Sequence, residues 1–99
     1  MTVKIRFLLY LESSPELRNG QKDVEIKLSD GATFGDLLLG LESNFGPELS
    51  NEIYDSEKHS TRDMVLAIIN GVLAHNLQRT DTALSDGDTV IFVPYVSGG

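Results

Sequence analysis

One stretch of helical periodicity, with strand patterns on either side of it, sets the kind of fold that this chain can adopt. The apolar residues of this stretch recur at spacings of one, three and four residues, as one face of a helix requires. They are Phe34, Leu37, Leu38, Leu41 and Phe45. Thr33 followed by Asp36 resembles a capping box in which Asp replaces the usual Glu, and Gly46-Pro47 ends the pattern. The sequence therefore predicts one amphipathic helix, whose apolar stripe can cover only one side of a neighbouring layer.

Two strand patterns precede the predicted helix. Residues 3–7 alternate between apolar and charged side chains, residues 8–11 are continuously apolar, and residues 23–28 alternate again. The intervening residues 12–22 contain turn formers such as Ser, Pro, Asn and Gly. The sequence predicts an antiparallel hairpin with a long connection between its strands.

Strand patterns also follow the helix. Residues 64–69 form a continuous apolar run, which is typical of a strand covered on both faces. Asn70-Gly71 is a strong hairpin signal, so residues 72–75 are predicted to form the returning strand. The polar segment 48–63, between the helix and this hairpin, is expected to be a loop with a short helix.

The last strand is predicted over residues 89–93, after a tight turn at 84–88 and before Pro94, which stops the strand. The resulting order is strand, strand, helix and three strands. This order predicts an α+β protein with a mixed sheet of about five strands and one main helix packed across one face. That is the β-grasp, or ubiquitin-like, fold.

Apolar side chains alternate along the last strand, where one pair is Val90 and Phe92 and the other is Ile91 and Val93. Because a single helix covers one face of the sheet, one of these pairs must face away from it. Loops such as residues 48–63 would cover that pair, or it would form a hydrophobic docking patch for a partner. The sequence leaves both interpretations open.

Composition and charge exclude several classes of site and partner. The chain has no cysteine, which excludes disulfides, thiolate metal sites and cysteine nucleophiles. A formal net charge of −7 and scattered Lys and Arg residues speak against nucleic acid as a partner. A strongly acidic domain suits a basic protein surface, although solubility alone explains the charge equally well.

No metal or membrane site is expected. His59 and His75 are isolated and are predicted to be surface residues, and residues 86–88 offer too few oxygen ligands for calcium. No apolar run approaches the ~20 residues that span a bilayer, and the charged N-terminus is unlike a signal peptide. We expect a cytoplasmic protein of one domain, residues 1–99, with a flexible tail over about 95–99.

The chemically informative feature is the C-terminal sequence Val96-Ser97-Gly98-Gly99, which follows soon after the last strand. Glycine has no side chain, so a glycine pair can thread a narrow channel in conformations closed to other residues. The terminal carboxylate is a poor electrophile and must first become an acyl adenylate, yet the chain has no phosphate-binding loop. We therefore predict that another protein activates Gly99; a frayed chain end is the alternative interpretation.

The last sixteen residues, LSDGDTVIFVPYVSGG, resemble the C-terminus of the MoaD/ThiS family of ubiquitin-like sulfur carriers. Further matches lie at residues 3–7, at the helix start over residues 30–38 and at the hairpin over residues 69–71. The resemblance spans nearly the whole chain. It is strongest to the small subunit of molybdopterin synthase and its archaeal relatives.

The resemblance implies a reaction sequence at Gly99. A ubiquitin-activating-type adenylating enzyme would use ATP and Mg²⁺ to make the Gly99 acyl adenylate, and a sulfur donor enzyme would convert it to a thiocarboxylate. The tail would then enter the large subunit of molybdopterin synthase, which builds the dithiolene of molybdopterin from two such sulfurs. In this scheme the chain is a carrier co-substrate and not an enzyme, and it binds no cofactor itself.

The resemblance also implies roles for residues before Gly99. Those that thread the partner's channel would be Gly98 and Ser97, and those that bind the partner would be Leu73, Val93, Tyr95 and Val96. The first two of the partner-binding residues would lie on an apolar docking surface, and the other two would lead into the channel. Ordinary strand packing is the alternative interpretation for all four.

Two other functions share the same activated intermediate. Archaeal relatives with this ending can join the terminal glycine to lysines of target proteins, and nothing in the tail distinguishes a lysine amine from sulfide as the nucleophile. Carriers for the thiazole ring of thiamine are the third possibility. We rank this one lower because those carriers usually lack much of the insert seen here between Gly46 and Asp63.

Overall fold

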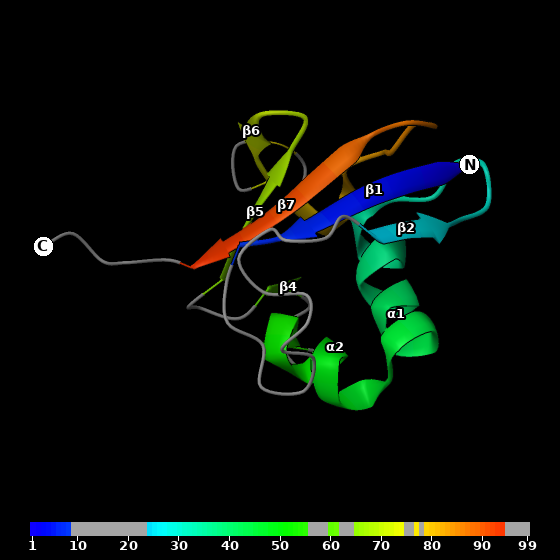
Figure 1. Ribbon diagram of the computed structural model, residues 1–99. Helices are drawn as coiled ribbons and strands as arrows, with labels where there is room; N and C mark the ends of the chain where they lie inside the picture. The colour runs from blue at the N-terminus through cyan, green and yellow to red at the C-terminus, as the bar shows by residue number, and fades with distance from the viewer. Residues whose placement is uncertain (9–23, 56–59, 62–64, 75–76, 78, 95–99) are drawn as a thin grey trace, which may run out of the picture.

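The structure has two layers, a five-stranded mixed sheet and a pair of helices packed on one of its faces (Figure 1). The computed structural model describes residues 1–8, 24–55, 60–61, 65–74, 77 and 79–94. The strands of the sheet are β1 (Thr2–Phe7), β2 (Val24–Lys27), β5 (Val65–Ile69), β6 (Val72–Leu73) and β7 (Thr89–Pro94). Together with the main helix α1 (Phe34–Phe45), this arrangement confirms the predicted β-grasp fold.

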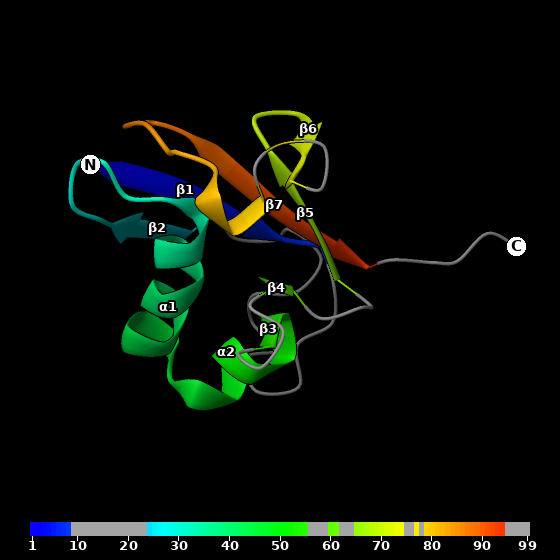
Figure 2. The same ribbon diagram turned by 180° about the vertical axis from the view of Figure 1, so that it is seen from behind.

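The first and last strands lie side by side in the middle of the sheet (Figures 1 and 2). The strand order is β2-β1-β7-β5-β6. β1 and β7 are parallel, and the remaining neighbours are antiparallel, which confirms the predicted β1–β2 hairpin. Since β7 pairs with a strand on each side, its backbone is held along both edges.

The core lies between the sheet and the helices and is centred on Phe92 of β7. Val90 and Phe92 are 0% exposed. The Phe92 ring stacks on Phe7 of β1 with 5.5 Å between ring centroids, and it meets Phe34 of α1 at 6.2 Å. Aromatic contacts of this kind add to the free energy gained from apolar burial. These three rings join the two central strands to the start of the helix.

Helix α1 begins at the predicted capping box. The Thr33 hydroxyl accepts a hydrogen bond from the backbone N–H of Asp36 at 3.3 Å, and the Asp36 carboxylate accepts one from the Thr33 N–H at 2.9 Å. The predicted apolar stripe faces the core, where Leu37, Leu38 and Leu41 are 0% exposed. The helix ends at Gly46, which adopts a positive φ of 95°.

A second helix, α2 (Pro47–Ile53), follows at once and begins with proline at its first position. It is the short helix expected within the polar segment 48–63. Leu49 and Ile53 are 0% exposed and belong to the same core as the α1 residues. This part of the segment therefore covers the face of the sheet that α1 also covers.

Three features differ from the sequence expectations. The prediction that both faces of residues 64–69 are covered is wrong: burial alternates along β5, because the helices pack on one side of the sheet only. The returning strand β6 is shorter than predicted. A second sheet, of β3 (Tyr54–Asp55) and β4 (Ser60–Thr61), and a 3-10 turn, η3 (Arg79–Asp81), were not predicted, because segments this short carry no periodicity.

The predicted hairpin at Asn70-Gly71 is confirmed, with positive φ angles of 50° and 87° at the two turn residues. Asn70 also ties this turn to the start of β7. Its side-chain oxygen accepts a hydrogen bond from the Thr89 N–H, and its own N–H donates to the Thr89 carbonyl, both at 2.9 Å. The hairpin is thereby fixed against the central strand.

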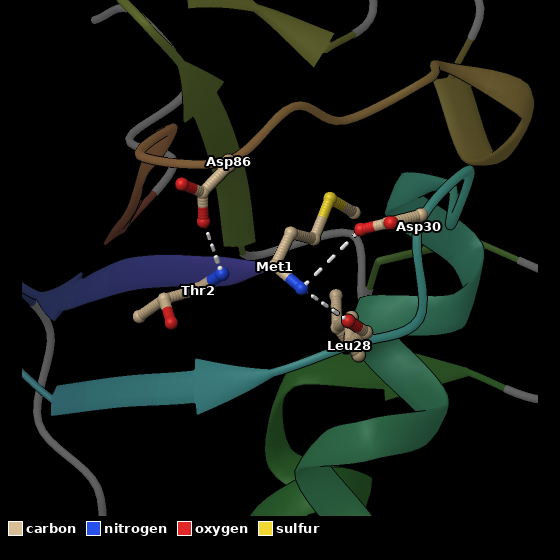
Figure 3. Close-up of polar contacts among 5 residues, drawn as sticks. All are labelled: Met1, Thr2, Leu28, Asp30 and Asp86. Atoms are coloured by element: carbon tan, nitrogen blue, oxygen red, sulfur yellow. Dashed lines mark hydrogen bonds and ion pairs between the residues drawn. The ribbon is translucent and has the colours of Figure 1, made fainter.

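The start of β1 is held by both of its neighbours (Figure 3). The Met1 ammonium group donates to the Leu28 carbonyl at 2.8 Å and lies 3.6 Å from the exposed Asp30 carboxylate. The Thr2 N–H donates to the Asp86 carboxylate at 2.7 Å, and the Gly87 N–H donates back to the Thr2 carbonyl at 2.8 Å. The predicted tight turn before β7 therefore also fastens the first strand.

The capping box generates a stability prediction. Replacing the cap by T33A should lower the free energy of unfolding by about 1 kcal/mol, because the Asp36 N–H loses its acceptor. T33S should retain most of the stability, since serine supplies the same hydroxyl. Urea denaturation of both variants measures the difference, with S43A, at an exposed helix position, as the control. Equal losses for T33A and T33S would contradict a stabilising role of the hydroxyl.

Candidate functional site

The predicted reactive tail lies beyond the described part of the chain. Gly99, the threading residues Gly98 and Ser97, and the partner-binding residues Tyr95 and Val96 all fall outside the described residues. Their roles stay predictions. The structure does place Pro94, from which the tail departs, and the two remaining candidates, Leu73 and Val93.

The departure point of the tail is held by hydrogen-bonded strands on both sides of β7. The Leu8 N–H donates to the Phe92 carbonyl at 2.8 Å on the β1 side, and Pro94 is paired with Val65 on the β5 side. Five residues follow Pro94, and a fully extended chain of five residues spans at most about 17 Å. A protein that acts on Gly99 must therefore contact this domain close to the end of β7.

An apolar patch lies beside this departure point, on the face of the sheet opposite the helices, here termed the open face. Strand register aligns Leu73, Ile68 and Ile91 in one row and Leu66 and Val93 in the next. Directly opposed residues of paired strands point to the same face. The open-face patch consists of Leu66, Ile68, Leu73, Ile91, Val93 and Leu8, which follows β1. Leu73 and Val93, predicted to share one apolar surface, lie on the same face of the sheet.

Burial decides which side of β7 faces the helices. Val90 and Phe92 are fully buried, whereas Ile91 and Val93 are only partly buried. Leu8 is 40% exposed. The sequence leaves open whether segment 48–63 covers Ile91 and Val93. The helical part of this segment does not cover them, because it packs in the core on the other side of the sheet.

The patch contains residues that sequence reasoning missed. The sequence predicts that Leu66 and Ile68 are covered, because residues 64–69 are all apolar and such a run hides the alternation of a strand. The apolar residues 8–11 likewise make Leu8 a continuation of the first strand. The pairing register of β1 and β5 with β7 identifies these positions. This register cannot be read from the amino-acid sequence alone.

The β1–β2 half of the open face is charged. Lys4 and Arg6 of β1 and Glu25 and Lys27 of β2 alternate with the buried residues of their strands and are exposed. Lys4 is aligned with Thr89 and Arg6 with Ile91. Arg6 therefore borders the apolar patch directly, and Lys4 lies one row farther from Pro94.

The described part of the chain offers neither a cluster of metal ligands nor a membrane-spanning helix. Among the described residues, no group of three or more His, Asp or Glu side chains is placed to hold a metal ion. His59 and His75 fall outside those residues, so their predicted surface positions stay predictions. No helix over the described ranges is long and apolar enough to cross a bilayer.

Replacing valine by threonine should lower the free energy of unfolding by different amounts on the two faces of β7. V90T should lower the free energy of unfolding by about 2 kcal/mol, because it buries a hydroxyl without a partner in the core. V93T should cost less than about 1 kcal/mol, since its hydroxyl remains accessible to water on the open face. Urea denaturation of both proteins measures the two losses. A loss for V93T as large as that for V90T would show that the open face is covered.

Comparisons with known proteins give the family. The model of the ThiS family matches residues 9–99. Small archaeal modifier protein 3 of Haloferax volcanii is 36% identical over 80 residues, which cover 81% of this chain and 84% of that protein. The solution structure of another Haloferax volcanii protein, 30% identical, has a TM-score of 0.74 and covers 100% of this chain and 87% of its own.

A more distant structure shows the same fold. The crystal structure of small archaeal modifier protein SAMP1 from Haloferax volcanii is 23% identical, covers 100% of both chains and has a TM-score of 0.72. Both structures therefore match the fold over the full length of this chain. With its family model matched over residues 9–99, this chain belongs to the ThiS family of small ubiquitin-like carriers and modifiers, which are generally not catalysts.

Proposed function

We propose that this chain is a sulfur carrier whose Gly99 carboxylate is adenylated by a partner enzyme and converted to a thiocarboxylate for molybdopterin synthesis. The observation that carries the proposal is the position of β7: the strand is held on both sides up to Pro94, five residues before Gly99. This arrangement gives the tail a fixed origin beside an apolar patch. A partner can therefore bind the domain and receive its terminal carboxylate at the same time.

The chemistry needs two steps on the carboxylate. One oxygen of Gly99 attacks the α-phosphorus of ATP, which releases pyrophosphate and leaves an acyl adenylate. A sulfur nucleophile then displaces AMP and leaves the thiocarboxylate. The chain has no cysteine, so the sulfur comes from another molecule. The partner supplies the sites for ATP and Mg²⁺, and this domain supplies the docking surface and the tail.

The open-face patch is the proposed docking surface. Its residues are aliphatic and partly exposed, and an apolar centre of this kind is typical of protein interfaces. Leu73 and Val93 occupy adjacent rows of the patch, and Val93 directly precedes Pro94. We propose that the adenylating enzyme and the large subunit of molybdopterin synthase both bind here. Tyr95 and Val96 would then enter the partner's channel ahead of Ser97 and Gly98.

A second candidate function is protein modification. The relative named small archaeal modifier protein 3 is similar over 81% of this chain, which favours attachment of Gly99 to lysines as an alternative use of the same adenylate. A lysine amine in place of the sulfur nucleophile would displace AMP and leave an isopeptide bond. The thiazole carrier of thiamine synthesis remains the lower alternative.

Mass spectrometry of the protein from its own cells separates these functions. The protein is purified without reducing additives and without a C-terminal tag, and its intact mass and C-terminal peptide are measured. One oxygen of Gly99 replaced by sulfur would support the carrier, and Gly99 joined to lysines of other proteins would support the modifier. A bare carboxylate with neither product, in cells that are making molybdopterin, would contradict both.

Deleting Gly99 should abolish adenylation and leave the melting temperature nearly unchanged, because the core ends at Phe92 and the deletion lies beyond β7. Pyrophosphate exchange with the adenylating enzyme measures the first effect, and thermal unfolding measures the second. Residues appended after Gly99 should have the same effect as the deletion. A deleted protein that still supports exchange would refute the role of Gly99.

The finer assignment to molybdopterin needs a separate measurement. Thiocarboxylated protein mixed with the purified large subunit of molybdopterin synthase and the sulfur-free precursor should give molybdopterin. The unmodified carboxylate form, as the matched control, should give none. Failure of the thiocarboxylated form in this reaction would leave sulfur transfer to another acceptor and would overturn the molybdopterin assignment.

A further inference from the structure

Among the described residues of the sheet, the basic side chains lie on one face. Lys4, Arg6 and Lys27 are on the open face of β1 and β2, whereas Arg79 belongs to η3, which contacts α1. The helices on the other side contain acidic residues and no lysine or arginine between Phe34 and Ile53. The open face is thus locally basic in a chain whose formal net charge is −7.

The neighbouring carboxylates offset only part of this local charge. Glu25 is the acidic residue of β2 on the same face, next to Lys4 in register. In the turn before β7, the Asp86 carboxylate accepts the Thr2 N–H at 2.7 Å and the Asp88 carboxylate accepts the Ser85 N–H at 2.8 Å. Both of these carboxylates keep their charge, and they lie at the end of the sheet away from Pro94, where Lys27 is paired with Thr2.

The distance between a charge and a docked partner determines how strongly the two interact. The molecule measures 26 Å across its shortest axis, whereas salt screens exposed charges beyond about 8 Å at physiological ionic strength. A partner on the open face therefore interacts with Lys4 and Lys27 much more strongly than with the acidic helices. The local charge of this face is opposite in sign to the net charge on which the expectation of a basic partner surface rests.

We infer that the adenylating enzyme that binds the open face presents an acidic rim to β1 and β2, around an apolar centre that covers the patch. This inference rests on the proposed function and adds the sign of the partner's charge. Lys4 is aligned with Thr89, one row from Ile91 of the patch, and Lys27 is paired with Thr2 at the far end of the sheet. A partner that covers the patch and extends over β1 and β2 would therefore meet both lysines at the rim of the interface. Charges at a rim act mainly on encounter and on affinity, and leave the chemical step unchanged.

The test is pyrophosphate exchange by the purified adenylating enzyme of the same genome, with this protein as the varied substrate. The variant K4Q/K27Q removes two positive charges from the open face. The matched control, S43E/N44E, changes the net charge by the same amount on the exposed surface of α1. Thermal unfolding of both proteins verifies that each is folded.

We expect K4Q/K27Q to raise the KM for this protein about fivefold with kcat unchanged, and the difference to shrink at high salt. The control should keep its KM within about twofold of the wild type. An unchanged KM for K4Q/K27Q, or an equal rise in the control, would overturn the acidic rim while exchange by the wild type still supports the proposed function. No exchange with the wild type would overturn the proposed function, and the rim with it.

Discussion

Burial of Phe92 against Phe7 and Phe34 requires the last strand of the chain to occupy the centre of the sheet. The other features follow from this placement. β1 and β5 must pair with the two edges of β7, and the helices must cover the face on which Phe92 lies. The opposite face keeps its apolar residues partly exposed, and the chain leaves the sheet at a fixed point, Pro94.

Short sequence motifs were sufficient to predict the elements whose ends depend on adjacent residues. Thr33 and Asp36 marked the start of α1, and Asn70-Gly71 marked the β5–β6 turn, because a cap and a type I′ turn each depend on adjacent residues. The burial of β5 could not be predicted in this way. Its alternation is set by helices that pack on one side only, and an all-apolar run is compatible with either arrangement.

The candidate site also has one part that adjacent residues indicate and one part that depends on strand pairing. Gly99 could be proposed from sequence because its predicted role depends on the chemistry of a terminal carboxylate and not on any neighbour in space. The docking patch needed strand register, since Leu66 and Ile68 become neighbours of Val93 and Ile91 through pairing over about twenty-five residues of sequence. Net charge averages over faces that a bound protein meets separately, so it does not by itself give the charge of the docking face.

The central position of β7 also has a mechanical consequence. A pull on the C-terminus acts along the axis of this strand, which is hydrogen-bonded to a parallel neighbour and to an antiparallel one. Such a load falls on both rows of bonds together, in shear, so they cannot be peeled apart one at a time as they could at an edge strand. The domain would resist unravelling from the end through which, in the proposed function, it is linked to other molecules.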